Sequence, residues 1–139
     1  MRETKYIIEP SIVEFDKIGE EGIGYISVAQ FNDNIPFEIK RVFWVYGTPV
    51  FVERGNHAHR QLTEVLIALS GVVEIVLENQ FGKEYTFTLN DNSQGLIVPN
   101  MHWIKVSLKT EATLLCLCSH EYNENDYIRD YNDFKNYRN

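Results

Sequence analysis

Residues 54–64 read Arg-Gly-Asn-His-Ala-His-Arg-Gln-Leu-Thr-Glu, and Gly71 follows a short apolar run. On an extended strand, His57 and His59 point to the same face because side chains alternate with a period of two. Glu64 would face the other way on one unbroken strand, so a bend or bulge after His59 is needed to return its carboxyl group to that side. Gly71 is expected to form the turn into the next strand. Together these residues predict a polar pocket held by β-structure.

The rest of the chain is a series of short extended segments separated by turn residues. Runs that alternate in polarity, or that are rich in β-branched and aromatic residues, favour strands, and clusters such as Gly47-Thr48-Pro49 favour turns. The expected strands are 6–15 (interrupted at Pro10), 25–31, 39–45, 65–69, 72–78, 85–89, 96–98, 104–108 and 114–117. About nine or ten short strands at this spacing predict an all-β fold, and a jelly-roll barrel with a polar mouth is the preferred architecture.

Only the segment 124–137 has helical periodicity, with Tyr127, Tyr131 and Phe134 recurring at spacings of three and four. Asn123 or Asn125 would cap this helix at its N-terminus. We expect a short C-terminal helix that covers one end of the barrel, with no role in the site. Since no linker or internal repeat is apparent, residues 1–139 are expected to form a single domain.

The composition of the chain restricts the possible partners. A formal net charge of −7 argues against a nucleic-acid-binding protein, which needs basic stripes to contact phosphates. No segment approaches the roughly 20 apolar residues of a membrane span, and the first eleven residues lack the apolar core of a signal peptide, so a cytoplasmic protein is expected. Cys116 and Cys118 are expected to be buried, reduced thiols, because two cysteines two apart on a strand are poorly placed for a disulfide.

One chemistry that fits the polar pocket is a metal centre. His57, His59 and Glu64 would be joined by His102, which follows a turn and enters a later strand. Imidazole and carboxylate groups are common ligands of divalent metals, and such a site would keep open positions for a substrate.

The second chemistry is proton transfer by an imidazole. The unperturbed pKa of histidine, near 6.5, suits proton abstraction next to a carbonyl group at neutral pH. Arg41 and Arg54 would bind an anionic, phosphorylated substrate through forked hydrogen bonds. Residues alone leave both chemistries open.

The spacing of His57, His59, Glu64 and Gly71 resembles the first motif of the cupin barrels. A longer set of segments is similar to one cupin family, the dTDP-sugar 3,4-ketoisomerases of bacterial surface-polysaccharide synthesis. The segments are Ile35-Pro36-Phe37-Glu38-Ile39-Lys40-Arg41-Val42, Arg54-Gly55-Asn56-His57-Ala58-His59, Val65-Leu66, Gly95-Leu96, and the tail Tyr122-x-Glu124-x-Asp126-Tyr127-Ile128-Arg129-x-Tyr131-x-x-Phe134. The resemblance covers roughly residues 13 to 137.

This resemblance implies a cupin jelly-roll homodimer that acts on a dTDP-linked keto-sugar without a metal or other cofactor. The implied reaction moves the ketone of dTDP-4-keto-6-deoxyglucose from carbon 4 to carbon 3 through an enediol, and the product leads to 3-amino-3,6-dideoxy sugars. His57 would be the base, and His59 its partner or a second proton carrier. Substrate contacts would come from Arg41, Phe43, Arg54, Glu64 and His102.

The sequence departs from the family pattern at four positions. Phe43 stands where the family tends to have Tyr, Ile104 follows Trp103 where a His is common, and Ile23 precedes Gly24 where Arg or Tyr is frequent. Glu64 replaces a Gln, which restores the metal-type cupin set. Two alternatives therefore stay open beside the ketoisomerase: a metal-dependent cupin enzyme using His57, His59, Glu64 and His102, and a cupin that binds a sugar nucleotide without turnover.

Overall fold

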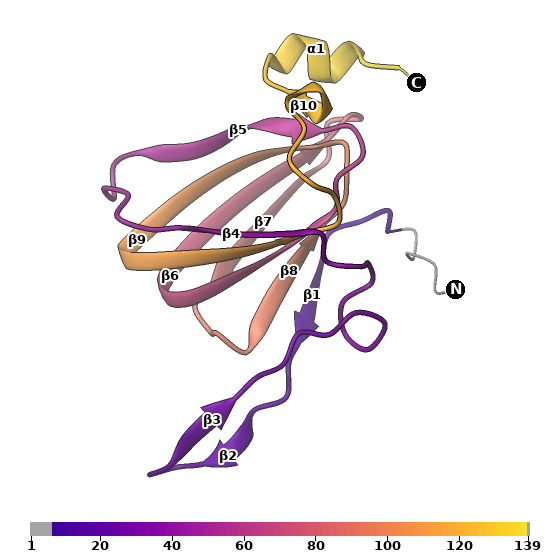
Figure 1. Cartoon of the computed structure of the whole chain (residues 1–139). Helices are drawn as coiled ribbons and strands as arrows, with labels where there is room; N and C mark the ends of the chain where they lie inside the picture. The colour runs from indigo at the N-terminus through magenta and orange to yellow at the C-terminus, as the bar shows by residue number, and fades with distance from the viewer. Residues whose placement is uncertain (1–6, 139) are drawn as a thin grey trace.

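Two long strands organise the computed structural model, which describes residues 7–138 (Figure 1). Strand β6 (Glu64–Asn79) and strand β9 (His102–Cys118) pair antiparallel from end to end, with Glu64 opposite Cys118 and Asn79 opposite His102. Four further strands pair directly with one of these two, so together they set the framework of the barrel.

The remaining strands complete the sheet on either side of this pair. Strands β7 (Glu84–Leu89) and β8 (Gln94–Val98) pair with β6, and β1 (Ser11–Glu14) pairs with β8. Strands β4 (Arg41–Val45) and β5 (Glu53–His59) pair with β9, and the short β10 (Tyr127–Ile128) adds to the outer edge of β5. The expected all-β jelly-roll barrel with a short C-terminal helix is confirmed.

The prediction that Gly71 forms a turn between two strands is wrong. Strand β6 continues through Gly71, and its register against β9 shifts on both sides of Ser70. Gly71 has φ +70°, and a Cβ atom there would lie 2.5 Å from the carbonyl oxygen of Thr110. Strands β6 and β9 lie so close at this point that both bend and remain paired.

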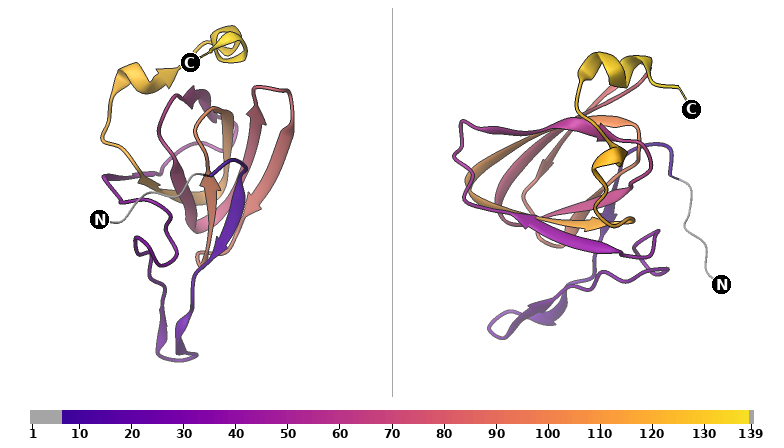
Figure 2. Two further views of the ribbon diagram at one scale, coloured as in Figure 1. Left: turned by 90° about the vertical axis from the view of Figure 1, so that its right-hand side faces the viewer. Right: turned by 45° about the horizontal axis from the view of Figure 1, so that its top comes forward.

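The N-terminal region is less extended than its sequence predicts. Strand β1 begins only at Ser11, while Tyr6 lies outside the described residues. The strand expected over 25–31 ends at Ile26, since Gly24–Ile26 (β3) pairs only with Ile18–Glu20 (β2). This hairpin projects away from the barrel (Figures 1 and 2), and the side chains of Ile18, Ile23, Tyr25 and Ile26 are exposed.

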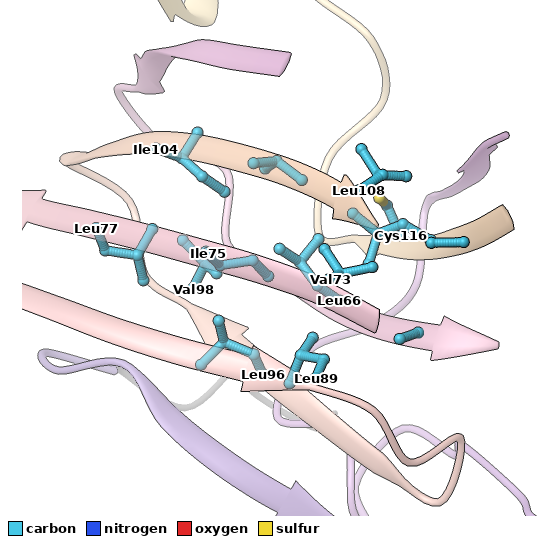
Figure 3. Packing of buried hydrophobic residues seen from close by; sticks show 14 residues of the cluster. Leu66, Val73, Ile75, Leu77, Leu89, Leu96, Val98, Ile104, Leu108 and Cys116 are labelled. Carbon is cyan, nitrogen blue, oxygen red and sulfur yellow. The ribbon is translucent and has the colours of Figure 1, made fainter. Parts of the chain in front are cut away.

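The barrel interior is filled by apolar side chains from alternate positions of its strands (Figure 3). Val73, Ile75 and Leu77 of β6 are fully buried, whereas Glu74 between them is exposed. The inward set expected from the alternation of residues 72–78 is therefore confirmed, and a period of two buries one face of the strand.

The C-terminal segment is not one helix. A 3-10 turn (Glu124–Asp126) is followed by β10 and then by the helix α1 (Tyr131–Asn136), which Asp130 caps by accepting a hydrogen bond from the N–H of Asp133. Asn123 caps the 3-10 turn instead. Pairing of Ile128 with Ala58 buries both side chains, and this burial outweighs the helical propensity of the segment.

Helix α1 is held on the barrel by Phe134. Its ring is fully buried and lies 5.7 Å from the ring of Trp103, centroid to centroid. The expected cover over one barrel end is therefore present, although it is shorter than predicted. None of the helices within residues 7–138 is long and apolar enough to cross a membrane.

Candidate active site

A cavity of about 280 Å³ opens into the barrel between β5 and the floor formed by β4, β6 and β9. Arg54, His57 and His59 line it from β5, and Phe43 and Glu64 line it from the floor strands. The spacing of the histidine motif predicted that His57, His59 and Glu64 would lie together, and they do. A concave site with an apolar floor and a few polar groups is the usual form of a small-molecule site.

The two histidines face this cavity because of a bulge in β5. The register against β9 shifts between Gly55 and His57, where Gly55 has φ +93° and Asn56 has φ +59°. After the bulge the strand regains its period of two, and the ring centroids of His57 and His59 lie 5.0 Å apart. The prediction that they share a face agrees with this geometry.

The hydrogen bond of His57 defines its tautomer. Its Nδ1 lies 3.1 Å from the carbonyl oxygen of Gly55. A carbonyl oxygen can only accept, so in the neutral ring Nδ1 carries the hydrogen and Nε2 keeps its lone pair. Burial lowers the pKa of His57 below 6.5. At neutral pH this ring is therefore uncharged and can take up a proton at Nε2.

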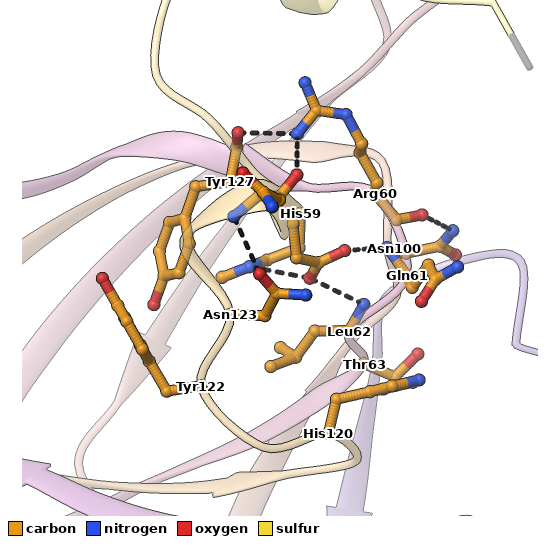
Figure 4. A network of polar contacts seen from close by, with 12 residues as sticks. His59, Arg60, Gln61, Leu62, Thr63, Asn100, His120, Tyr122, Asn123 and Tyr127 are labelled. Carbon is orange, nitrogen blue, oxygen red and sulfur yellow. Dashed lines mark hydrogen bonds and ion pairs between the residues drawn. The ribbon is translucent and has the colours of Figure 1, made fainter.

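His59 lies deeper, and an acid from the C-terminal segment lies near its Nδ1, which is buried without a hydrogen-bond partner. Oδ2 of Asp126 lies 3.4 Å from Nδ1 of His59, and Asp126 also accepts hydrogen bonds from the N–H groups of Gln61 and Leu62 (Figure 4). Burial, reinforced by His57 and by nearby arginines, lowers the pKa of His59 to about 3. Both imidazoles are thus neutral at neutral pH.

Glu64 enters the cavity from the strand after the histidines. Strand β5 ends at His59, the chain turns over 60–63, and Glu64 opens β6, so a turn between two strands returns its carboxyl group to the histidine side. Glu64 is opposite Cys118, which in turn is opposite Arg41, so the three form one row across β6, β9 and β4. Burial raises the pKa of Glu64 to about 7, against an opposing effect of Arg41.

Replacing Glu64 with Gln is expected to stabilise the protein at alkaline pH. The folded pKa of about 7 lies above the ordinary value of 4.5, so the folded protein favours the protonated form, and stability falls as pH rises from 4.5 through 7. Glu64→Gln removes this loss. In urea unfolding, the variant should match the wild type near pH 4.5 and exceed it by up to about 3 kcal/mol near pH 8.5. A stability difference independent of pH would contradict the assignment.

The two predicted arginines occupy different places. Arg54 lines the cavity wall and is exposed to solvent. Arg41 lies at the side of the cavity floor, with its guanidinium carbon 5.3 Å from the ring centre of Phe43 and 5.5 Å from that of Tyr122. Its Nε is buried without a hydrogen-bond partner. A guanidinium whose Nε–H has no partner can donate to an anionic or carbonyl oxygen.

Two further lining residues come from the C-terminal segment and were not predicted. The ring of Tyr127 lies 4.3 Å from that of His59 and 5.1 Å from that of His57, centroid to centroid. Arg129 also lines the cavity and forms a bidentate ion pair with Glu124, at 2.7 and 2.8 Å. The expectation that this segment only covers the barrel is therefore wrong. The signal in the sequence was the alternation of Tyr127 and Arg129 around the apolar Ile128.

His102, in contrast, is not among the residues that line the cavity. It begins β9, its Nδ1 lies 3.0 Å from the carbonyl oxygen of Asn100, and its ring lies 6.0 Å from that of Tyr85. The set of four ligands expected for a metal is therefore not assembled. Within residues 7–138, no group of three or more His, Cys, Asp or Glu side chains is arranged to hold a metal ion.

The cysteines are buried and free, as predicted, and Cys116 lies on the cavity floor. Burial raises the pKa of the Cys118 thiol to about 12 and also raises the pKa of Cys116. Neither thiol is ionised near neutral pH, so they serve as small apolar groups rather than as nucleophiles.

Comparison with known proteins gives consistent matches over nearly the whole chain. A family model described as "FdtA: WxcM-like, C-terminal" matches residues 8–139. The TDP-4-oxo-6-deoxy-alpha-D-glucose-3,4-oxoisomerase of Aneurinibacillus thermoaerophilus is 33% identical over 131 residues, which cover 94% of this chain and 93% of the relative. The crystal structure of a 3,4-ketoisomerase from Helicobacter canadensis is 37% identical with a TM-score of 0.86, over 93% of this chain and 96% of the other.

A third relative was solved with a bound sugar nucleotide. It is a histidine-to-asparagine variant of the 3,4-ketoisomerase QdtA from Thermoanaerobacterium thermosaccharolyticum, in complex with TDP-4-keto-6-deoxyglucose. Its TM-score is 0.87 at 32% identity, over 93% of each chain. The resemblance noted in the sequence, including the cupin barrel, is confirmed by these matches. The chain belongs to the FdtA family of TDP-sugar 3,4-ketoisomerases and is an isomerase.

Proposed function

We propose that this enzyme converts TDP-4-keto-6-deoxyglucose to the TDP-3-keto-6-deoxyhexose, on the route to 3-amino-3,6-dideoxy sugars. The observation that carries the proposal is the neutral imidazole of His57, whose Nδ1 is bound to the carbonyl oxygen of Gly55 in a cavity lined by Arg54 and Arg129. The sugar nucleotides named for the relatives support the choice of substrate.

In the proposed reaction, His57 takes the proton at carbon 3, whose acidity is raised by the neighbouring ketone. The electrons of that bond form the double bond of an enediol as oxygen 4 gains a proton. The protonated imidazole then returns its proton to carbon 4, and oxygen 3 loses its proton as the new ketone forms. A base of this kind needs a pKa near or below the working pH, and burial provides this for His57. His59, whose ring lies 5.0 Å from that of His57, is the partner of the first imidazole or carries a second proton.

The anionic part of the substrate would lie at the arginine side of the cavity. Arg54 and Arg129 both line it, and Arg41 lies beside its floor. Guanidinium groups bind phosphate oxygens through two parallel hydrogen bonds. These local cations explain how a chain with a net charge of −7 can take an anionic substrate.

The test is incubation of the enzyme with TDP-4-keto-6-deoxyglucose in deuterated buffer, followed by NMR. The proposal expects a 3-keto product and deuterium on the sugar ring at the migrating carbons. Absence of both would reject it.

We also propose that the enzyme works as a homodimer that buries the β2–β3 hairpin. Its exposed apolar side chains, among them Ile23 at 82% exposure, have no partner within the described part of the chain. Sedimentation should give twice the chain mass. Ile23→Glu should shift the mass toward that of one chain, whereas Phe81→Glu, at an exposed site on another turn, should not. A wild-type mass of one chain would contradict the proposal.

A further inference from the structure

We propose that Glu64 relays the hydroxyl proton between oxygens 3 and 4 of the sugar while His57 moves the carbon-bound hydrogen. This inference rests on the proposed ketone migration. It assigns a second catalytic group to the cavity, and it predicts that the two proton movements can be separated experimentally.

Moving a ketone from carbon 4 to carbon 3 relocates two hydrogens. One leaves carbon 3 and arrives at carbon 4, and the other leaves oxygen 3 and arrives at oxygen 4. In the first step His57 takes the hydrogen from carbon 3, the C–H electron pair forms the carbon–carbon double bond, and oxygen 4 takes the proton of the Glu64 carboxyl group. In the second step the Glu64 carboxylate takes the proton of oxygen 3, the ketone forms there, and His57 returns its proton to carbon 4. Both side chains end in their starting states.

A carboxyl group suits the oxygen transfer because it donates from one oxygen and accepts at the other. Glu64 lines the same cavity as His57 and is 5% exposed. Within residues 7–138 its carboxyl group forms no hydrogen bond or ion pair with the protein, and its oxygens are not among the enclosed polar atoms that lack a partner. The carboxyl group therefore faces the cavity with its hydrogen-bonding capacity unused, so Glu64 is available to the sugar oxygens.

The surroundings of Glu64 bring its pKa close to neutral pH, where the protonated and the ionised carboxyl group are both populated. The pKa of about 7, caused by burial, supplies an acid at the start and a carboxylate in the middle of the reaction. The titratable and charged groups around the cavity and its floor are Arg41 from β4, Arg54, His57 and His59 from β5, Cys116 and Cys118 from β9, Tyr127 from β10, and Arg129. Arg41, in the same row as Glu64, limits how far the pKa rises.

Other groups in the cavity are less suited to this transfer. Phe43 has no hydroxyl group, and the two thiols are held in their protonated forms by burial. The hydroxyl of Tyr127 is the competing candidate, because its ring lies against both histidines. Tyr127→Phe is therefore the matched comparison for Glu64→Gln.

The experiment measures two rates on the same samples: deuterium exchange at carbon 3 and formation of the 3-keto product. The amide group introduced by Glu64→Gln can donate a hydrogen bond to oxygen 4, so exchange at carbon 3 through the enediolate should stay within about threefold of the wild type. An amide cannot pass a proton from oxygen 3 to oxygen 4, so product formation should slow by about 100-fold or more. Wild-type product formation should also decline as pH rises above about 7, the pKa of Glu64, because the first step needs the protonated carboxyl group. The decline should be absent in Glu64→Gln. Tyr127→Phe should change the two rates by the same factor.

Three results would overturn the assignment. Glu64→Gln could slow both rates equally, which is the behaviour of a positioning residue, or it could leave product formation unchanged. Tyr127→Phe could be the variant that separates the two rates. A wild-type enzyme that shows neither exchange nor product would instead reject the proposed function, and this inference with it. Unfolding is an insufficient explanation for a loss in Glu64→Gln, because that variant is expected to be at least as stable as the wild type.

Discussion

Replacing His57 with Asn is expected to abolish ketone migration and hydrogen exchange at carbon 3 together. Asparagine cannot take up a proton near neutral pH, so the enediol does not form, and the expected loss is about 100- to 10,000-fold in each rate. The lone pair on Nε2, left free by the hydrogen bond between Nδ1 and Gly55, is the feature that this substitution removes. NMR of the reaction in deuterated buffer reports both rates in one experiment.

His120→Asn is the control for this variant. His120 is exposed, is not a lining residue of the cavity, and contacts Ser119 through Nδ1 at 2.7 Å. It should therefore retain both rates. If His57→Asn retained exchange, the base would have to be another group, and His59 would be the first to examine, by the same substitution.

Gly55→Ala is expected to have the largest effect on folding stability. A Cβ atom at this position would lie 2.7 Å from the carbonyl oxygen of Ile104, and the residue adopts φ +93°, which L-residues avoid. Strain in the backbone and the contact with a neighbouring strand add, so the free energy of unfolding should fall by about 2–5 kcal/mol. The carbonyl group of Gly55 also positions His57, so activity should fall as well. Urea unfolding and the isomerase assay measure the two effects.

Gly82→Ala separates the two causes. Gly82 has φ +88°, close to that of Gly55, but a Cβ atom there would approach only Nζ of Lys135, at 4.0 Å. This variant should lose about 1–2 kcal/mol from backbone strain alone and should keep full activity. Equal destabilisation by the two substitutions would show that the contact with Ile104 relaxes without cost.

The sequence predicted the parts of the fold and site that depend on local patterns. Alternation in β6 predicts correctly that Val73, Ile75 and Leu77 are buried, and alternation in β4 and β7 predicts which side chains share a face, because a period of two is a property of the strand itself. The spacing of His57 and His59 predicts their common face for the same reason. A bulge at Gly55 and Asn56 does not disturb this, because it lies before both residues.

Features that depend on distant contacts could not be predicted in this way. Gly71 looks like a turn residue, but the close crossing of Thr110 keeps the bent chain paired, and no local pattern records that crossing. The segment that contains Tyr127 and Arg129 was expected to be helical because of the spacing of its aromatic residues. Its pairing with β5 depends on a contact between residues far apart in the sequence, which local spacing does not reveal. His102 lies two residues before Ile104, which lines the cavity from β9. Its place at the very start of the strand leaves His102 outside the cavity lining, and the sequence alone does not give that position.

The way in which the C-terminal segment is attached affects how recombinant versions should be made. The side-chain amide of Gln80 donates hydrogen bonds to the carbonyl oxygens of Phe134 and Tyr137, so helix α1 is bound to the turn between β6 and β7. An affinity tag fused at the C-terminus would lie next to these hydrogen bonds, and their loss would loosen the segment that places Tyr127 and Arg129 in the cavity wall. A chain cut short before Asn123 would lose β10 from the edge of the sheet and uncover Ala58 and Trp103, and its cavity would lack the wall that Tyr127 and Arg129 form.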